Sequence, residues 1–226
     1  MHMRIVILAI LGTFGCGGGG SDSGGDGETN AERGDRSPGA NCDTIRIDDP
    51  EDLVYYSSCV TATNLNIGID FAGEVVLPNL NRVTRDVSDS LSGVTTIRLP
   101  NLVYVGHSLS LGASSVESIV LPSLETVGGH FNINAAANLT ELELERLREV
   151  GTNQDLQWGV TRGIFDVSMN DKLSELNLPF LETVTRRFRV SGNDNLRSIY
   201  SPFLSVTLPD YDWPYQQLCN AVIDTI

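Results

Sequence analysis

A pattern of apolar and polar positions returns along the chain about every 22 residues. Each repeat carries a phrase of the form Leu-Pro-x-Leu-x-x-Val, in which the apolar spacing is constant and the other positions vary. The phrases begin at Leu77, Leu99, Leu121, Leu144, Leu178 and Ser201, the fourth without its proline and the last with its apolar ends replaced. Subtraction of these numbers gives steps of 22, 22, 23, 34 and 23 residues, so one repeat contains an insertion. A recurrence of this period is typical of a solenoid.

Short segments within each repeat alternate between apolar and polar residues as β-strands do. In Leu109–Leu111 and Phe131–Ile133, for example, two apolar residues flank one polar residue. Because side chains alternate between the two sides of a strand, the apolar pair points into the coil and the polar residue points outward. A polar turn, a second strand and the proline-containing phrase complete the repeat. The pattern therefore predicts an all-β solenoid of about six coils.

One coil departs from this pattern. Asp89 occupies a position that Ile, Leu or Val fills in the other coils. Burying a carboxylate without a partner is costly, so we expect the register of this strand to slip and to turn Leu91 inward. We also expect this coil to be the weakest of the stack.

The N-terminal end of the solenoid carries the signals of a capping helix. The segment Asp-Pro-Glu-Asp at residues 49–52 provides an N-cap, a proline at the first helical position and two carboxylates in the first turn. We expect a short helix that ends near Ser58, with Leu53, Val54 and Tyr56 on its apolar side. Such a helix would cover the open end of the first coil.

The C-terminal end is expected to be sealed in a similar way. Tyr211, Trp213 and Tyr215 precede a stretch from Gln216 to Ile226 that is predicted to form a short helix. Cys219 lies in this stretch. It is either a buried apolar thiol of the cap or a thiol that exchanges with another partner.

Residues 1–16 are predicted to be an export signal. Arg4 precedes an apolar run from Ile5 to Leu11, and small residues lead to Cys16. The arrangement resembles bacterial lipoprotein signals, in which the cysteine is acylated and becomes the new N-terminus; an ordinary secretory signal with a chance cysteine is the alternative. Residues 17–40 are too polar and Gly-rich to bury a core, so we expect a flexible tether followed by a solenoid domain at 41–226.

Export also determines the redox state of the cysteines. Cys42 and Cys59 lie beyond the tether and are close enough in sequence to close a short loop. Outside the cytoplasm they are expected to form a disulfide. A loop of about 17 residues corresponds to roughly 3 kcal/mol of stabilisation in the chain-entropy estimate.

The charge of the chain excludes one class of partner. There are 15 basic and 29 acidic side chains, which gives a formal net charge of -14. Phosphate binding needs a positive surface, so a nucleic-acid partner is not expected. The same reasoning disfavours docking of the polypeptide itself onto anionic lipids.

The succession Val-Glu-Ser-Ile-Val-Leu-Pro-Ser-Leu-Glu-Thr-Val-Gly-Gly-His-Phe-Asn-Ile at residues 116–133 resembles the receptor L-domain pattern of growth-factor-receptor ectodomains and related fungal GPI-anchored cell-wall proteins. The resemblance covers about Cys42 to Leu208. It implies a short right-handed parallel β-helix with a binding or structural role and no catalytic residues. Leucine-rich repeats are the rival interpretation, although the Asn expected at a fixed offset is missing. Bacterial surface repeats of that kind have a closer period but an Ala-Phe-x-x-Cys segment that is absent here.

Catalysis on such a scaffold would use carboxylates clustered at outward strand positions. On the first side of the coil, Asp166 is the single outward carboxylate, and Arg189 one coil later is expected to pair with it. On the second side the outward residues include Glu143 but show no paired carboxylates. His107 and His130 have no third ligand, so we predict neither a metal site nor a cofactor, and no enzymatic activity.

Two features are candidates for binding. The first is the insertion at residues 151–162, which carries Gln154 and Trp158 on a projecting loop; its Trp folding back onto the coil is the alternative. The second is the main concentration of positive charge, formed by Arg162, Arg186, Arg187 and Arg189. It would hold an anionic glycan or a lipid headgroup, unless ion pairs with nearby carboxylates occupy these side chains.

These features predict a lipid-anchored protein of the bacterial cell envelope that acts as a non-catalytic binding or structural module for a protein or glycan ligand. Gly17 follows Cys16 in place of the Asp that retains lipoproteins in the inner membrane in enteric-type sorting, so we expect the outer membrane. The alternative is a β-helix carbohydrate-active enzyme acting on polysaccharide, which requires at least two carboxylates facing one groove within about 10 Å. In a third interpretation the Trp158 loop joins a larger surface complex.

Overall fold

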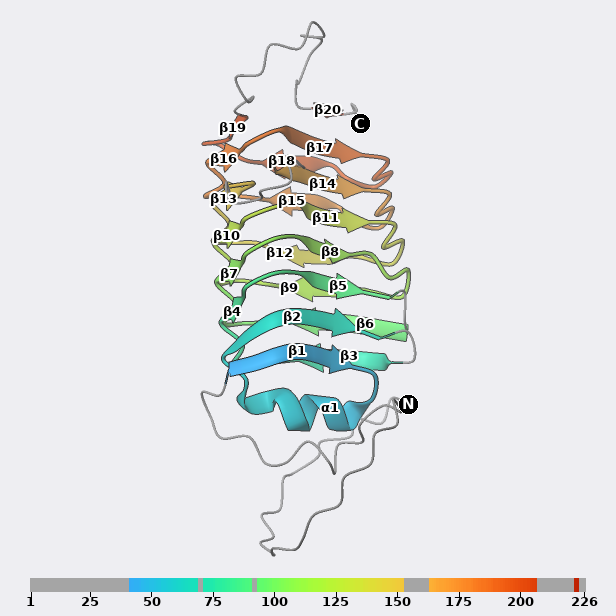
Figure 1. Ribbon diagram of the computed structural model, residues 1–226. Coiled ribbons are helices and arrows are strands. Elements are labelled where there is room, and N and C mark those ends of the chain that lie inside the picture. The colour runs from blue at the N-terminus through green and yellow to red at the C-terminus, as the bar shows by residue number, and fades with distance from the viewer. Residues whose placement is uncertain (1–40, 69–70, 91–92, 153–162, 207–221, 224–226) are drawn as a thin grey trace, which may run out of the picture.

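The computed structural model describes residues 41–68, 71–90, 93–152, 163–206 and 222–223, which form a right-handed parallel β-solenoid of about seven turns (Figure 1). The proposed export signal with Cys16 and the tether at 17–40 lie outside the described residues. So do Leu91, Gln154, Trp158, Arg162 and Cys219.

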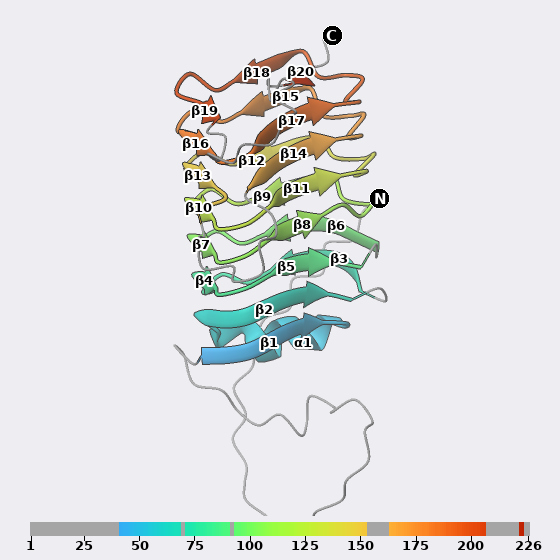
Figure 2. The same ribbon diagram turned by 45° about the horizontal axis from the view of Figure 1, so that its top comes forward.

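Each coil has three sides, and equivalent strands of successive coils stack in parallel (Figure 2). Face 1 contains β1 (Asn41–Ile47), β2 (Thr61–Ile67), β5 (Val87–Asp89), β8 (Leu109–Leu111), β11 (Phe131–Asn134), β14 (Ile164–Ser168), β17 (Arg187–Ser191) and β20 (Val222–Ile223). Face 2 contains β3 (Ala72–Val76), β6 (Gly93–Arg98), β9 (Ser118–Val120), β12 (Glu141–Glu143), β15 (Glu175–Asn177) and β18 (Ser198–Tyr200). Face 3 contains β4 (Arg82–Val83), β7 (Tyr104–Val105), β10 (Thr126–Val127), β13 (Glu149–Val150), β16 (Thr183–Val184) and β19 (Ser205–Val206).

Faces 1 and 3 belong to one 14-stranded sheet. The first half of β2 pairs with β4 and its second half pairs with β5, so this long strand joins the two faces. Face 2 is divided into a four-stranded sheet, from β3 to β12, and a two-stranded sheet of β15 and β18.

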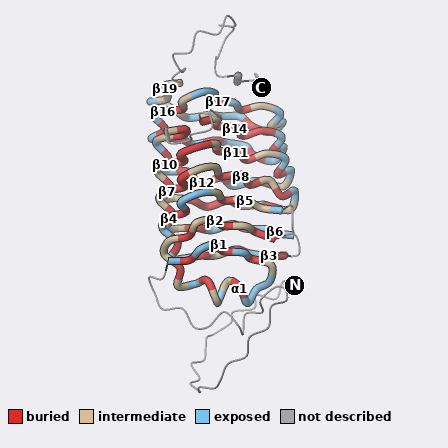
Figure 3. Tube along the Cα trace, viewed as in Figure 1, coloured by how far each residue is buried: buried red, intermediate tan, exposed pale blue. Residues whose placement is uncertain are grey.

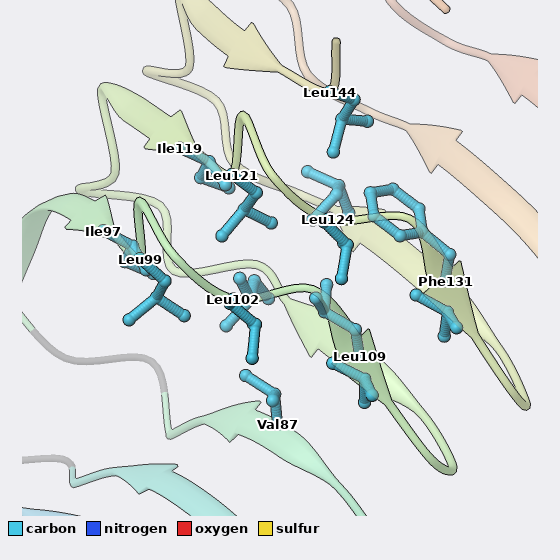
Figure 4. Close-up of a cluster of buried hydrophobic side chains, with 14 of the residues drawn as sticks. Val87, Ile97, Leu99, Leu102, Leu109, Ile119, Leu121, Leu124, Phe131 and Leu144 are labelled. Atoms are coloured by element: carbon cyan, nitrogen blue, oxygen red, sulfur yellow. The ribbon is translucent and has the colours of Figure 1, made fainter. Parts of the chain in front are cut away.

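The core is one continuous stack of inward side chains, which Figure 3 shows as buried segments in every coil. Leu99, Leu121 and Leu178, which open the repeated phrase, are fully buried as the alternation predicts. Figure 4 shows Leu99 and Leu121 at equivalent places in successive coils. Because each coil contacts only its neighbours, the stability of a coil depends on the coils on either side of it.

Three aromatic rings continue this stack on face 1. Phe131, Phe165 and Phe188 are almost fully buried, and their ring centroids are 4.9 Å apart at both steps. The planes differ by 4° and 8°, so the rings are stacked nearly parallel. The three neighbouring strands place them in the same register, with Phe131 beside Phe165 and Phe165 beside Phe188.

Amide side chains connect the turns that follow face 1. The Oδ1 of Asn170 accepts a hydrogen bond from Ala136 N at 3.0 Å, and its Nδ2 donates to Ile133 O at 2.9 Å. Asn193 makes the equivalent pair of bonds one coil later, from Asn170 N and to Val167 O. Asn170 is fully buried, and both ends of its amide group are satisfied by the preceding coil.

The predicted N-terminal cap is present. Helix α1 (Pro50–Tyr55), continued by a 3-10 turn at Tyr56–Ser58, lies across the end of the stack beside β1 (Figure 1). The Asp49 carboxylate accepts hydrogen bonds from two amides of the first turn, and the Asp52 carboxylate accepts one from Asp49 N, which completes a capping box. The expected Cys42–Cys59 disulfide is also formed. Val54, however, is 74% exposed, so its expected place on the apolar side of the helix is wrong.

The number of coils is roughly as expected. The stack has about seven turns where about six were predicted, because β1 adds a coil whose Ile45 and Ile47 align with β2 although it lacks the repeated phrase. The structure corrects two further expectations. The register does not slip at Asp89, whose strand pairs in line with β2. The Oδ2 of Asp89 instead accepts hydrogen bonds from the amides of Gly112 and Ala113 in the next coil, at 2.9 and 3.1 Å.

The second correction concerns the C-terminal end, where a helix was expected from Gln216 to Ile226. Within that range the structure describes only Val222 and Ile223, which form β20. This strand pairs with β17, Val222 beside Arg189 and Ile223 beside Val190, and so continues face 1. A strand forms here because the edge of β17 offers main-chain partners that a helix would leave unpaired.

Candidate functional site

Face 2 is interrupted at one junction, between β12 and β15. At the other junctions of this face the first leucine of the repeated phrase donates its amide hydrogen to the strand of the next coil. These bonds run from Leu77 to Arg98 O, from Leu99 to Val120 O, from Leu121 to Glu143 O and from Leu178 to Tyr200 O, at 2.8 to 3.3 Å. Among the described residues, the missing member of this series is the bond from Leu144 N to Asn177 O.

A second series of main-chain bonds is broken at the same place. Thr140 N donates to Glu117 O, and Arg197 N donates to Ser174 O, both at 2.9 Å. No bond from Ser174 N to Thr140 O joins these two in the part of the chain that the structure describes. Among the described strands, β12 pairs only with β9, and β15 pairs only with β18. The two strands therefore present edges toward each other without forming a ladder.

A groove of about 360 Å³ lies at this junction. Its lining comes from β12 and the residues next to it on one side and from β15 and β18 on the other: residues 140–145, 175–177, 198 and 200. The volume falls at the lower end of the range of about 300–1,000 Å³ for ligand pockets. Figure 1 shows β12 and β15 next to each other in the stack, nearer its C-terminal end than its capped end.

Four carboxylates line this groove, Glu141, Glu143, Glu145 and Glu175. We call these residues the acidic groove. In the register of the other junctions Glu175 would lie directly opposite Glu141, and like charges in that position destabilise a strand pair. Each of these two instead has a serine opposite it on its other side, Ser118 for Glu141 and Ser198 for Glu175. The charge pattern therefore disfavours a ladder at this junction.

Glu143 has a carboxyl group whose pKa is shifted by its surroundings. Burial raises its pKa above the ordinary value for glutamate, and the neighbouring carboxylates of Glu141 and Glu145 raise it further. Arg98, on the other side, acts against this shift. Glu143 therefore takes up a proton more readily than an isolated glutamate, while Glu141 and Glu175 lie exposed at the edges.

The groove also has apolar and aromatic parts. Leu142 and Leu176 point inward from the centres of β12 and β15 and are 8% and 1% exposed, so apolar side chains lie beneath the gap. Tyr200 on β18 is 57% exposed and lines the far side. The site thus combines unpaired strand edges, an apolar floor and a negative rim.

The predicted arginine cluster is only partly free for a ligand. Arg189 lies 3.4 Å from Asp166 and also donates to Ser191, so the expected ion pair is confirmed. Arg186 and Arg187 are exposed on the same part of face 1. Arg162 and the loop residues Gln154 and Trp158 lie outside the described residues.

The histidines have local roles. His130 Nδ1 accepts a hydrogen bond from Ile164 N at 3.2 Å, which requires a neutral acceptor nitrogen. Burial lowers the pKa of His130, and the positive charge of Arg186 lowers it further. His107 lies 3.8 Å from Asp86. In the described ranges no three His, Cys, Asp or Glu side chains are grouped closely enough to hold a metal ion.

The sequence analysis missed Glu141 and Glu175 as site residues. It considered one outward position per strand on face 2, whereas β12 directs both Glu141 and Glu143 outward, on either side of buried Leu142. The signal was the acidic residue two positions before Glu143 and its counterpart Glu175 in the next coil. The longer step of 34 residues between these coils concealed that the two glutamates are equivalent.

Neither the helix nor the 3-10 turn among the described residues has the length and hydropathy needed to cross a bilayer. Comparisons with protein-family models, curated proteins and solved structures find nothing that matches this chain.

Proposed function

We propose that this chain is a lipid-anchored protein of the bacterial cell envelope whose β-solenoid is a non-catalytic binding module. The acidic groove is the feature that most favours binding, because within the described residues no strand pairs with the facing edges of β12 and β15, and Glu175 on one of these edges is exposed. A purely structural solenoid would gain stability by pairing β12 with β15, as it does at every other junction of face 2.

The anchor rests on the N-terminal sequence. Cys16 follows an apolar run with the composition of an export signal, and Gly17 after it is compatible with delivery to the outer membrane. The solenoid begins with β1 beside the cap α1, so lipid at Cys16 would attach the protein at its capped end. The acidic groove lies several coils away from that end. The parallel solenoid, its capping helix and the nearby disulfide are also features expected of a relative of the receptor L domains.

The anchor is tested by replacing Cys16 with serine. We expect the full chain produced in a bacterium to sediment with membranes and to incorporate labelled palmitate. The Cys16→Ser protein should lose the label and leave the membrane fraction, whereas Cys219→Ser, which removes a thiol at the other end, should change neither. A Cys16→Ser protein that still sediments with membranes would remove the anchor from the proposal.

A specific observation also favours the carbohydrate-active alternative. Glu141 and Glu143 face one groove, and the raised pKa of Glu143 is a property of general acids in glycoside hydrolases. Exposed Tyr200 would offer a sugar a stacking surface. Release of reducing ends from a panel of envelope polysaccharides separates the two functions. A binding module releases none; release that Glu143→Gln and Glu141→Gln both abolish would make the groove an active site.

A further inference from the structure

We propose that the acidic groove binds an extended, basic segment of a partner protein, which enters the gap as an added strand between β12 and β15. This inference rests on the proposed binding function and specifies its ligand. The segment would alternate apolar residues with Lys or Arg. Addition of a strand to a sheet edge is a common mode of peptide recognition, in which main-chain bonds give affinity and alternate side chains give specificity.

The broken ladder leaves main-chain donors and acceptors with which such a segment could pair. Glu141 N and Glu143 O are both used toward β9. Because successive residues of a strand direct their main-chain groups to opposite sides, Leu142 and Leu144 direct theirs toward the gap. By the same alternation, Glu175 and Asn177 face the gap from β15. Each edge therefore offers donors and acceptors that, in the described part of the chain, no strand occupies.

The side chains of the groove select the composition of the segment. An added strand would place every second side chain against the floor formed by Leu142 and Leu176, which are both buried. Its other side chains would point outward between Glu141, Glu143 and Glu175. Lys or Arg at these positions would separate carboxylates that now repel each other, so charge complementarity favours a basic segment.

Other occupants fit less well. A second copy of this chain carries a net charge of -14 and would bring more negative charge to the groove. The insertion at residues 151–162 has one Asp and one Arg, so its charge does not complement four carboxylates. A glycan lacks the regular amide donors and acceptors that two facing strand edges would satisfy, and an anionic glycan would also be repelled.

The test uses the full lipidated chain in detergent and a fluorescein-labelled octapeptide of alternating Arg and Val. Main-chain bonds provide the affinity, so the probe requires no further sequence. Two matched peptides serve as controls: one with Glu for each Arg, and one with the Arg-Val sequence but N-methylated at alternate amides, which keeps the charge and prevents pairing. Fluorescence anisotropy should show binding of the Arg-Val peptide and at least about tenfold weaker binding of both controls.

Variants locate the site. The double variant Glu141→Gln/Glu175→Gln should weaken binding of the Arg-Val peptide by about two- to thirtyfold, as expected for the loss of two exposed ion pairs. Glu74→Gln, an exposed glutamate on β3 of the same face, should have no effect. Hydrogen exchange gives an independent readout, because the amide of Leu144 should become protected on binding, while that of Leu121, already bonded to Glu143 O, should not change.

Several outcomes would overturn the proposal. Absence of binding, or equal binding of the N-methylated peptide, would exclude an added strand. Binding that appears only after deletion of residues 153–162 would assign the groove to that segment of this chain. Competition by self-association would assign it to a second copy of the chain. Displacement of the peptide by a neutral oligosaccharide would assign it to a glycan. None of these results affects the membrane fractionation of Cys16→Ser, so failure of this inference and failure of the anchor are distinguishable.

Discussion

The stacked rings of face 1 permit a quantitative test of how neighbouring coils stabilise one another. Phe165 lies between Phe131 and Phe188 and contacts a ring on each side, with centroids at 4.9 Å in both directions. Phe131, at the end of the series, has one ring neighbour and Leu109 on its other side. We therefore compare Phe165→Leu with Phe131→Leu, two changes that remove the same atoms from equally buried positions.

The two variants should differ by the value of one ring contact. An aromatic pair contributes about 0.5–1.5 kcal/mol beyond its buried area. Phe165→Leu loses two such contacts, or about 1–3 kcal/mol, and Phe131→Leu loses one. The cost of exchanging a ring for a smaller apolar side chain is common to both variants, so it cancels in the comparison. Phe165→Leu should be the less stable of the two by about 0.5–1.5 kcal/mol.

Urea unfolding followed by circular dichroism measures this difference as a shift of midpoint at constant m-value. Because coils of a solenoid can unfold in part, the same transition should be followed by tryptophan fluorescence, and the two curves must coincide for the free energies to be comparable. Equal destabilisation by both variants would refute the additive ring contacts. A larger loss for Phe131→Leu would show that relaxation of the coil, rather than stacking, determines the cost.

Three further predictions concern polar side chains. Asn170→Ala leaves two main-chain groups of the preceding coil without partners and should cost about 2–6 kcal/mol in urea unfolding. The pKa of His130 is lowered in the fold, so the unfolded chain binds the proton more readily than the folded chain. The free energy of unfolding should therefore fall as pH decreases from about 6.5 toward the folded pKa. His130→Gln should remove this pH dependence, and His107→Gln should retain it. The raised pKa of Glu143 means that ionisation of this side chain opposes folding. The stability that the protonated form provides is present below about pH 4.3 and is lost as pH rises through the folded pKa. Glu143→Gln should therefore melt at a higher temperature than the wild type at pH 7, and the difference should vanish in acid.

Much of this fold could be predicted because it depends on local patterns. The alternation along each strand identified inward residues such as Leu121, and the Asp-Pro-Glu-Asp segment identified the cap. The Cys42–Cys59 disulfide followed from spacing and export. The ion pair of Asp166 with Arg189 could also be predicted, because a regular solenoid places equivalent residues of successive coils side by side.

Features that depend on contacts between coils were harder to predict. The expected register slip at Asp89 was wrong because the carboxylate has partners, the amides of Gly112 and Ala113. These amides belong to the following turn, and no sequence pattern indicates that they would bind a carboxylate. The first coil was missed because β1 lacks the repeated phrase and is separated from β2 by the capping helix. The gap on face 2 is lined by Glu141 and Glu175, whose equivalence is hidden by the insertion between their coils.

The interruption of face 2 is tolerated because the other two faces continue past it. At the same level of the stack β11 pairs with β14 on face 1 and β13 pairs with β16 on face 3. The loss is therefore limited to main-chain bonds at one junction, each with a net value of about 0.5–1.5 kcal/mol. A serine or threonine in place of Glu175, as at the equivalent Thr96 and Ser118, would remove the like-charge pair from this junction. The stack therefore does not need the pairing of β12 with β15, and these two edges are the ones that the proposed peptide would use.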